Sequence, residues 1–366
     1  IKMTSDNITV IMKPTNQCNL RCKYCFAGTG DMGHDRRLMT KEVGKAAVDY
    51  IIAHSGKRKH CEIDFFGGEP LVNMPVVKYV TEYVRQKEKE TGKVFKLTLT
   101  TNGVLLNDEN IKWLNDNNIS MVLSLDGRKE VHDYMRPDVG GHGTYDKVVK
   151  NFKKLVDSRD GNNYYLRGTF TNRNMDFSKD VLSMADEGFD ILSVEPVVLK
   201  DSPYGFTKED LPKIFAEYDK LTEIYLKRKK EGKGFFFFHF NIDLEHGPCV
   251  AKRLSGCGAG HEYYAVAADG NMYPCHQFAG RENYMLGNVF EGVKNKELPK
   301  EFRKTHVLSK EKCRDCWAKF FCSGGCHANA DLFHGNIHEP YELGCELQKK
   351  RCECAIVVKT AEKFGL

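Results

Sequence analysis

Three cysteines near the start of the chain have a spacing that suits metal chemistry. Cys18, Cys22 and Cys25 follow the pattern Cys-x3-Cys-x2-Cys, and Phe26 comes directly after them. Three thiolates within eight residues can hold three irons of a [4Fe–4S] cube and leave the fourth iron without a protein ligand. A structural zinc site usually closes with four Cys or His ligands, and the next cysteine is only Cys61. The pattern therefore favours a catalytic cluster with an open iron over zinc or a chance grouping.

The residues that follow the expected strands must position this chemistry. From residue 8 to about residue 198, short apolar β-branched runs alternate with amphipathic helical stretches. The expected strands are Ile8–Lys13, Glu62–Phe66, Lys96–Thr100, Met121–Leu125, Tyr165–Thr171 and Ile191–Val198. The expected helices are Lys41–His54, Pro75–Thr91, Asp108–Asn117, Tyr145–Asp157 and Lys179–Glu187, with Thr40 and Ser178 as N-caps of the first and last. Six β/α units predict an α/β fold, an open partial (β/α)6 barrel, because a closed barrel usually has eight.

A second region follows a long helical stretch from about Lys208 to Lys230, which Thr207 and Asp210 open as a capping box. Residues 235–366 contain ten of the fourteen cysteines and little apolar periodicity, so this region is expected to depend on metal. We therefore expect a barrel with a bridging helix over residues 1–234 and a small Cys-rich iron–sulfur domain over residues 235–366. The apolar run Phe235–Phe238 predicts a short buried strand rather than an edge for peptide docking.

The composition and charge of the chain indicate its compartment and the classes of partner that it lacks. The 366 residues carry a net charge of +5, which is mild and does not by itself support nucleic-acid binding. No apolar run reaches membrane-spanning length, and the start of the chain lacks the layout of a signal peptide. We therefore expect a cytoplasmic protein with no membrane or nucleic-acid partner. Fourteen cysteines in a reducing compartment favour metal binding over disulfides.

Parallel α/β barrels place their chemistry on loops beyond the carboxyl ends of the strands, and the polar and glycine-rich motifs fall there. In strand order they are the three-cysteine loop, Gly67-Gly68-Glu69-Pro70, Thr100-Thr101-Asn102-Gly103 and Ser124-Leu125-Asp126-Gly127, with Arg167 on the fifth strand and Glu195 on the sixth. Gly67 and Gly68 let the backbone approach a ligand closely. Asp126-Gly127 could equally form only a turn.

The three-cysteine pattern resembles the signature of the radical S-adenosylmethionine (SAM) enzymes. In that family the open iron chelates SAM, and one electron splits it into methionine and a 5′-deoxyadenosyl radical. The resemblance implies that the Gly-Gly-Glu-Pro loop contacts the SAM amino group and that Ser124 and Asp126 contact its ribose and carboxylate. Arg167 could pair with the same carboxylate. The residues expected to be catalytic are Cys18, Cys22 and Cys25, and those expected to bind SAM are Phe26, Gly67, Gly68, Glu69, Pro70, Thr101, Asn102, Ser124, Asp126 and Arg167.

Seven C-terminal cysteines form a second pattern: Cys257-x17-Cys275, then Cys313-x2-Cys316-x5-Cys322-x3-Cys326, then Cys345. Alone, the central block could be a zinc ribbon. Beside the radical-SAM-like core it resembles the SPASM extension, which holds two auxiliary [4Fe–4S] clusters. The resemblance implies that the second auxiliary cluster is held by Cys313, Cys316, Cys322 and Cys345, and the first by Cys257, Cys275 and Cys326. The expected cofactors are therefore SAM and three [4Fe–4S] clusters.

Two closed clusters need eight thiolates, and this motif supplies seven. Unless Cys249 or His261 fills the gap, the first auxiliary cluster keeps an open iron, which could bind a substrate cysteine without a protein base. The related anaerobic sulfatase maturases have an Asp, taken as the base, next to the cysteine corresponding to Cys275; here that residue is His276. This departure counts against formylglycine formation. His276 could act as a base or a ligand, or be an ordinary packed histidine.

From about Ile8 to Ala361 the chain resembles the thioether-forming maturases of six-cysteine (SCIFF) peptides, in the sactipeptide and ranthipeptide class. The stretches that carry this likeness are Cys18–Ala27, Asp64–Pro70, Arg167–Thr171, Cys275–Phe278 and Cys313–Cys316. Those maturases join a Cys sulfur to a carbon of an acceptor residue in a ribosomally made peptide. We therefore predict a radical SAM oxidoreductase that acts on a Cys-containing precursor peptide and receives electrons from a flavodoxin- or ferredoxin-type donor.

One departure from these maturases concerns peptide recognition. Typical members carry an extra N-terminal segment that resembles a winged helix, whereas seventeen residues precede Cys18 here. Either the chain is truncated or a separate protein recognises the leader. Three alternatives stay open: another SPASM-type peptide oxidation such as sulfatase maturation or C–C crosslinking, a non-enzymatic electron-transfer protein, and a zinc-stabilised nucleic-acid module.

Overall fold

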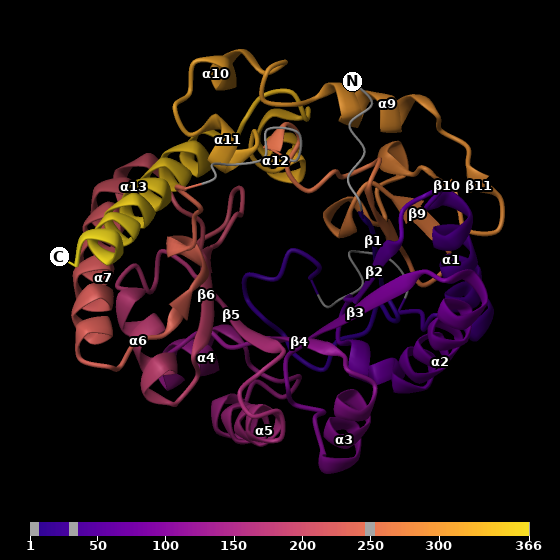
Figure 1. The fold of residues 1–366 in the computed structure, drawn as a ribbon, viewed down its shortest axis with the longest axis horizontal. Helices are drawn as coiled ribbons and strands as arrows, with labels where there is room; N and C mark the ends of the chain where they lie inside the picture. The colour runs from indigo at the N-terminus through magenta and orange to yellow at the C-terminus, as the bar shows by residue number, and fades with distance from the viewer. Residues whose placement is uncertain (1–6, 29–35, 246–252, 366) are drawn as a thin grey trace. The chain divides into compact units, whose positions relative to one another are not determined.

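The computed structural model describes residues 7–28, 36–245 and 253–365 (Figure 1). The chain forms two compact units that interleave along the sequence. Unit 1 comprises Ile1–Ser124, Asp133–Tyr164 and Cys257–Arg303, and unit 2 comprises Leu125–His132, Tyr165–Gly256 and Lys304–Leu366. The predicted domain boundary between residues 234 and 235 stays a prediction.

Unit 1 is built on a largely parallel sheet. Its strands are hydrogen-bonded in the order β11-β10-β9-β8-β1-β2-β3-β4. The parallel strands are β1 (Asn7–Met12), β2 (His60–Phe65), β3 (Val94–Thr101), β4 (Ser120–Ser124) and β8 (Tyr263–Val266). The antiparallel extension consists of β9 (Asn271–Tyr273), β10 (Gly287–Asn288) and β11 (Gly292–Val293). Val10 pairs with Ile63 and Ile63 with Leu97, all buried, so the strand centres form the core.

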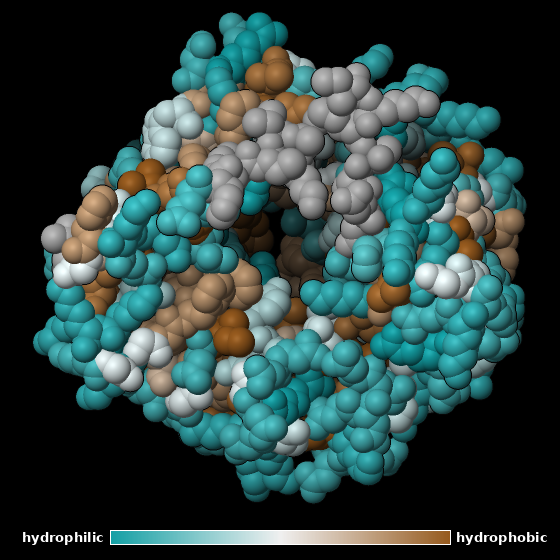
Figure 2. All heavy atoms as spheres, in the orientation of Figure 1, coloured by the Kyte–Doolittle hydropathy of each residue, from teal (hydrophilic) through white to brown (hydrophobic). Residues whose placement is uncertain are grey.

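Helices follow the first four strands of unit 1, as the alternation predicts. They are α1 (Lys41–His54), α2 (Met74–Thr91) after the short 3-10 helix η1 (Pro70–Asn73), α3 (Asp108–Asp116), α4 (Lys129–Met135) and α5 (Tyr145–Asp157). Thr40 caps α1 as expected, because its Oγ1 accepts a hydrogen bond from the Val43 N–H at 3.3 Å. In this view the outward surface over α1, α2 and α3 is mostly hydrophilic (Figure 2), as amphipathic helices require.

Unit 1 also contains short helices from its C-terminal part, η4 (His276–Phe278), η5 (Glu282–Tyr284) and α9 (Glu297–Lys304), whose last residue belongs to unit 2. Phe278 and Phe302 pack edge to face at 5.6 Å between ring centroids, and both are fully buried. This aromatic packing supplies a small core of its own beside the antiparallel strands.

Unit 2 supplies the two remaining β/α repeats and the C-terminal helices. Its parallel strands lie in the order β5-β6-β7, with bounds Tyr164–Phe170, Ile191–Pro196 and Phe236–Phe237. The elements between them are α6 (Ser178–Asp186), η2 (Lys208–Asp210) and α7 (Leu211–Lys230), and η3 (Phe238–Phe240) follows β7. The last helices are α10 (Glu311–Arg314), α11 (Lys319–Cys322), α12 (His327–His334) and α13 (Glu342–Phe364), and α13 packs along α7 (Figure 1). The six predicted β/α units are therefore present, and the Thr207–Asp210 capping box is confirmed.

One local prediction in unit 2 is wrong, and another is confirmed only in part. Ser178 does not cap α6: Phe177 is the N-cap residue, and the Ser178 hydroxyl donates to the Glu217 carboxylate instead. Phe177 is fully buried against Phe170, at 4.3 Å between ring centroids, which fixes where the helix begins. The run Phe235–Phe238 forms only the two-residue strand β7, in which alternation buries Phe237 and leaves Phe236 39% exposed.

The helix α13, which has 23 residues, was not expected from the sequence. Its buried stripe includes Leu343, Leu347, Cys354, Val358 and Ala361, at helical spacing. Charged residues interrupt this stripe in the sequence, so its helical period is hard to recognise. The cysteines also favour an interpretation of the segment as metal-binding. None of the helices in the described ranges combines the length and apolar character needed to cross a membrane.

Candidate functional site

The cysteines after β1, which we call the three-thiol loop (Cys18, Cys22 and Cys25), lie in a tight turn of unit 1. The Cys25 N–H donates to the Cys22 carbonyl oxygen at 3.1 Å. Burial, together with the nearby charges of Glu69 and Cys25, raises the pKa of Cys18 to about 11. Burial also raises the pKa of Cys25. Thiols held this way ionise readily only when a metal supplies positive charge, so the donor set suits an iron–sulfur cluster.

The Gly-Gly-Glu-Pro segment after β2 lies directly against the three-thiol loop. The Gly68 N–H donates to the Thr15 carbonyl oxygen at 3.2 Å, and the Glu69 N–H donates to the Gln17 carbonyl oxygen at 2.8 Å. A Cβ atom at Gly68 would lie 2.0 Å from that Gln17 oxygen. Glycine is therefore required at this position because the two backbones touch.

The Glu69 carboxylate fastens the loop after β2 to the loop after β3. It is 1% exposed and accepts hydrogen bonds from the Leu71 N–H at 3.1 Å, the Thr101 hydroxyl at 2.8 Å and the Asn102 N–H at 2.8 Å. Burial raises its pKa to about 7. A carboxylate has about four acceptor positions, so three are used within the protein. A contact between Glu69 and the SAM amino group stays a prediction.

Asn102 connects the same loop to the cysteines. Its Nδ2 donates to Asn19 Oδ1 at 2.8 Å and lies 3.9 Å from Cys18 Sγ. The structure thus brings the predicted residues Thr101 and Asn102 together with the three-thiol loop and the Gly-Gly-Glu-Pro segment. The three-thiol loop, the Gly-Gly-Glu-Pro segment, Thr101 and Asn102 therefore lie together at the carboxyl ends of β1, β2 and β3.

Three rings extend this site toward the second cysteine pattern. Phe26 and Phe66 stack at 6.4 Å between ring centroids, and the His276 ring lies 5.6 Å from Phe26 and 4.8 Å from Phe66. His276 Nδ1 also lies 3.3 Å from the Tyr263 hydroxyl. Since His276 follows Cys275 directly, this packing places the Cys275 segment beside the three-thiol loop within unit 1.

The other residues predicted to bind SAM lie at or just after the end of β4 and in the middle of β5. Ser124 is the last residue of β4. In unit 2 the Asp126 carboxylate is fully buried, and its Oδ1 accepts a hydrogen bond from the Thr169 N–H at 3.0 Å. Arg167 is exposed on β5, and its charge acts on Glu195 and His239. Contacts of Ser124, Asp126 and Arg167 with SAM stay predictions.

The predicted ligands of the second auxiliary cluster lie together in unit 2. We call Cys313, Cys316, Cys322 and Cys345 the four-thiol group. Burial, together with the charges of the other three thiols, raises the pKa of Cys345 to about 12. The backbones of Gly325 and Gly324 hydrogen-bond to the Cys322 sulfur. Four soft sulfur donors held together suit a closed [4Fe–4S] cluster, and equally a zinc ion by ligand chemistry alone.

All thirteen cysteines within the described ranges are free thiols. Those same residues include no set of three His, Cys, Asp or Glu side chains that converge on a single ion. In a [4Fe–4S] cluster each thiolate binds a different iron, so its ligands need not converge on one point.

The first auxiliary set is divided between the units. Cys257 and Cys275 belong to unit 1 and Cys326 to unit 2, so their grouping stays a prediction. Cys249 lies outside the described residues. His261 Nδ1 lies 3.2 Å from the Ala259 carbonyl oxygen, and burial lowers the pKa of the imidazole.

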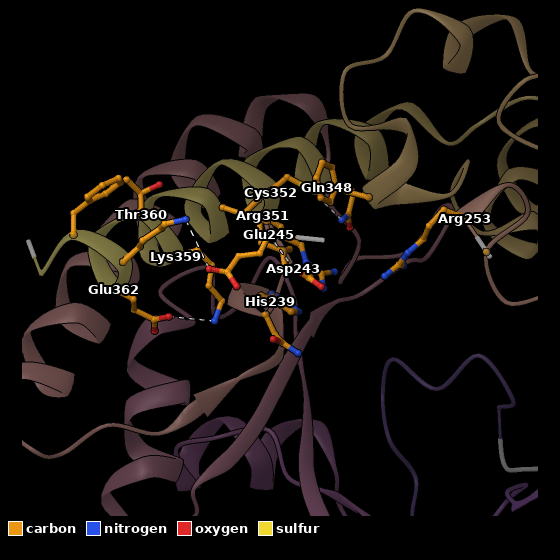
Figure 3. A pocket seen from close by; sticks show the side chains of 17 residues that line it. His239, Asp243, Glu245, Arg253, Gln348, Arg351, Cys352, Lys359, Thr360 and Glu362 are labelled. Carbon is orange, nitrogen blue, oxygen red and sulfur yellow. Dashed lines mark hydrogen bonds and ion pairs between the residues drawn. The ribbon is translucent and has the colours of Figure 1, made fainter. Parts of the chain in front are cut away.

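One buried network of hydrogen bonds and ion pairs was not predicted from the sequence. His239 is completely buried in unit 2; its Nε2 lies 3.0 Å from Glu195 Oε1 and its Nδ1 lies 3.0 Å from the Tyr218 hydroxyl. Arg351 Nη1, from α13, donates to Glu195 Oε2 at 3.2 Å. His239 and Arg351 line a pocket of about 1190 Å³ (Figure 3). The only signal for this network in the sequence is the place of Glu195 at the end of an expected strand.

Comparisons with known proteins bear on this arrangement. The family model described as the Radical SAM superfamily matches residues 12–175, and the SPASM model, described as an iron-sulfur cluster-binding domain, matches residues 257–317. The cysteine-type anaerobic sulfatase-maturating enzyme of Clostridium novyi is 26% identical over 351 residues, 89% of each chain. The radical SAM cyclopropyl synthase TigE of Paramaledivibacter caminithermalis is 22% identical over 92% of this chain and 71% of that protein.

Solved structures share the fold. Histidine-tagged anSMEcpe with bound AdoMet has a TM-score of 0.81 at 22% identity, over 97% of this chain and 95% of that chain. SuiB of Streptococcus suis bound to S-adenosylmethionine has a TM-score of 0.62 at 18% identity, over 91% of this chain and 76% of that chain. The α/β fold with a Cys-rich C-terminal region is thus confirmed as the radical SAM fold with a SPASM region.

Proposed function

We propose that this chain, a radical SAM enzyme with a SPASM domain that modifies peptides or proteins, forms thioether bonds between a Cys sulfur and an acceptor carbon of a ribosomally made peptide. The observation that carries the proposal is the composition of the first auxiliary set. The pattern supplies three thiols where a closed cluster takes four, and the residue after Cys275 is His276 rather than a carboxylate. A substrate thiolate could take the remaining ligand position.

The cofactors are SAM and three [4Fe–4S] clusters, which fit the thiol groups described above. When bound, the N-terminal cluster supplies the electron that cleaves SAM to a 5′-deoxyadenosyl radical. The chain's own residues then have three tasks in the proposal. The three-thiol loop and the Gly-Gly-Glu-Pro segment position SAM, with Glu69 accepting from its amino group. The strand ends exclude water from the radical, and Ser124, Asp126 and Arg167 fix the ribose and carboxylate.

The proposed reaction balances as follows. The acceptor carbon loses a hydrogen atom to the 5′-deoxyadenosyl radical, which becomes 5′-deoxyadenosine. The substrate thiol loses a proton, its sulfur bonds to the carbon, and one electron leaves for the auxiliary set. Cys257, Cys275 and Cys326 would hold a cluster whose open iron could bind the substrate thiolate near the radical carbon, and the packing of the Cys275 segment beside the three-thiol loop supports this. Each crosslink removes two hydrogens from the peptide.

The proposal also includes the compartment, the domain bounds and the partners of the enzyme. We infer a cytoplasmic enzyme whose barrel spans residues 1–234 and whose auxiliary-cluster domain spans residues 235–366. Its partners would be a Cys-containing precursor peptide and a flavodoxin- or ferredoxin-type electron donor. The solved anSMEcpe with bound AdoMet and Cp18Cys peptide, which shares the fold, is a precedent for peptide binding on this scaffold.

Product analysis tests the proposal. The chain is co-expressed with a six-cysteine precursor peptide, and the purified peptide is reduced, alkylated and weighed. A thioether removes two hydrogens, blocks alkylation of the donor cysteine and survives reductant. A peptide whose cysteines are all alkylated, although 5′-deoxyadenosine forms, would contradict thioether formation. Co-expression with the Cys25→Ala variant controls for spontaneous oxidation.

A second function is favoured by sequence similarity alone. The cysteine-type sulfatase-maturating enzymes match at 26% identity over most of this chain. Sulfatase-type maturation removes the substrate sulfur and leaves an aldehyde, so the product reacts with hydrazides. The same mass measurement therefore separates the two reactions. A non-enzymatic electron-transfer role would give no 5′-deoxyadenosine at all.

A further inference from the structure

A buried lysine lies beside the four-thiol group. Lys310 is 3% exposed, and its ammonium donates to the Gly324 carbonyl oxygen at 2.9 Å. It precedes α10, and its own carbonyl oxygen accepts a hydrogen bond from the Cys313 N–H at 3.0 Å. Lys310 is therefore fixed to the two chain segments that carry Cys313 and Cys322.

The charges that act on Lys310 come from cysteines. Within the described ranges no carboxylate forms an ion pair with its ammonium. Burial lowers the pKa of Lys310, whereas the charges of the Cys313, Cys322, Cys326 and Cys345 thiols raise it and so favour the ammonium form. A buried ammonium that has only a carbonyl partner is costly unless an anion lies nearby. In this part of unit 2 the available anions are the ionised thiols.

Other lysines near the four-thiol group differ from Lys310. Lys312 is 57% exposed and pairs with Glu342, and Lys349 is 33% exposed and pairs with Glu346. Solvent and these carboxylates screen their charges. Lys310 alone among these three is buried and has no acidic partner among the described residues.

We propose that Lys310 is the buried counter-charge of the auxiliary clusters and raises their reduction potential. The inference rests on the proposed function, because it takes the four-thiol group as cluster ligands. A cluster held by four thiolates gains one negative charge on reduction, so a fixed cation nearby stabilises the reduced form more than the oxidised form. The charge of Lys310 also acts with Cys326, a predicted ligand of the first auxiliary cluster. One cation would thus favour electron arrival at both clusters, where the surplus electron of each crosslink must go.

A redox titration tests this role. Cys18, Cys22 and Cys25 are replaced by Ala in the full chain, so that only the auxiliary clusters give an electron paramagnetic resonance signal. Lys310→Met should lower the equilibrium constant for reduction about tenfold, which is about 59 mV for one electron. Lys310→Arg keeps the charge and should stay near the parent potential. Lys312→Met is the matched control, and we expect little change because that lysine is exposed.

The outcomes separate this inference from the proposed function. Iron and sulfide analysis of the parent that shows no C-terminal clusters would overturn the cofactor assignment itself. Clusters that are present but have the same potential in the parent and in Lys310→Met would overturn only the role of Lys310. Loss of the clusters in Lys310→Met with retention in Lys310→Arg would support a required positive charge. Loss in both variants would show that the shape of lysine matters and would overturn the counter-charge.

Discussion

The three-thiol loop and the four-thiol group use the same side chain in different surroundings. The three-thiol loop follows a strand and touches a glycine segment and an asparagine amide, and the charge of a buried carboxylate, Glu69, acts on Cys18. The four-thiol group sits on the short helices α10 and α11, the turn between them and the first turn of α13. Strand-end loops leave room for a ligand, whereas four thiols brought together from helices could enclose a metal, which would relieve their mutual repulsion when ionised. One arrangement suits substrate binding and the other suits storage of charge.

The charges around the two groups differ as well. Glu69 and Arg21 act with opposite signs on Cys18, and the cations Arg136 and Lys13 act on Cys25. Three cations act with the thiols of the four-thiol group: Lys310 with Cys313 and Cys322, and Lys349 and Lys312 with Cys345. Cations favour the reduced form of a cluster, and cations act at both groups. The comparison teaches that the three-thiol loop differs in having a buried carboxylate, Glu69, whose charge acts on Cys18.

The largest expected effect separates the two groups completely. Cys25→Ala removes one of three ligands and should reduce SAM cleavage to the background of the buffer, because no radical can form. Cys345→Ala disrupts the four-thiol group and should retain 5′-deoxyadenosine formation while crosslinked peptide is lost. Chromatography of 5′-deoxyadenosine and mass analysis of the peptide measure the two products. Equal loss of 5′-deoxyadenosine in both variants, with both proteins folded, would break the comparison.

A glycine substitution tests how closely the three-thiol loop is packed. Gly68→Ala puts a Cβ atom 2.0 Å from the Gln17 carbonyl oxygen, so one backbone must move. We expect a loss of about 3 kcal/mol or more in the free energy of unfolding, since overpacking against backbone cannot relax. Gly92→Ala is the control: Gly92 has φ +69° but open space around it. Its cost should be about 1 kcal/mol. Equal effects in denaturant unfolding would mean that Gly68 is needed only for flexibility.

The network that joins α13 to β6 should make unit 2 sensitive to acid. Burial lowers the pKa of His239, so the unfolded chain takes up a proton below about pH 6.5 before the folded protein does. Burial alone would raise the pKa of Glu195, but His239 and Arg351 hold it well below its usual value. Both groups therefore contribute stability at neutral pH that is lost as the pH falls, first through about 6.5 for His239 and then through about 4.5 for Glu195.

Denaturant unfolding between pH 7.5 and 5 measures this effect. The slope due to His239 is at most about 1.4 kcal/mol per pH unit. His239→Gln should remove it. Tyr218→Phe deletes the hydroxyl near Nδ1 and should cost about 1 kcal/mol at every pH while the slope remains. An unchanged slope in His239→Gln would assign the acid sensitivity to other groups.

The comparison also shows which features a single sequence reveals. Local patterns were sufficient to predict the six β/α units, because residues such as Ile63 and Leu97 alternate with polar neighbours. They were also sufficient to predict that Thr40 caps α1. The three-thiol loop could be predicted because its cysteines lie within eight residues. The network of His239 could not, because its partners are distant in sequence: Glu195 is 44 residues away, and Arg351 is 156 residues from Glu195. Only folding brings such residues together.

The smallest expected effect sharpens the contrast between buried and exposed charge at the four-thiol group. Lys312 pairs with Glu342, but their side chains are 57% and 40% exposed, so water and salt screen the pair. Lys312→Gln should change the free energy of unfolding by less than about 1 kcal/mol, and about 1 M NaCl should abolish even that difference. Denaturant titrations of both proteins at low and high salt measure it. A loss above about 2 kcal/mol that persists in salt would mean that Lys312, although exposed, stabilises the four-thiol group as a buried charge does. Burial would then not be what distinguishes Lys310 from its neighbours.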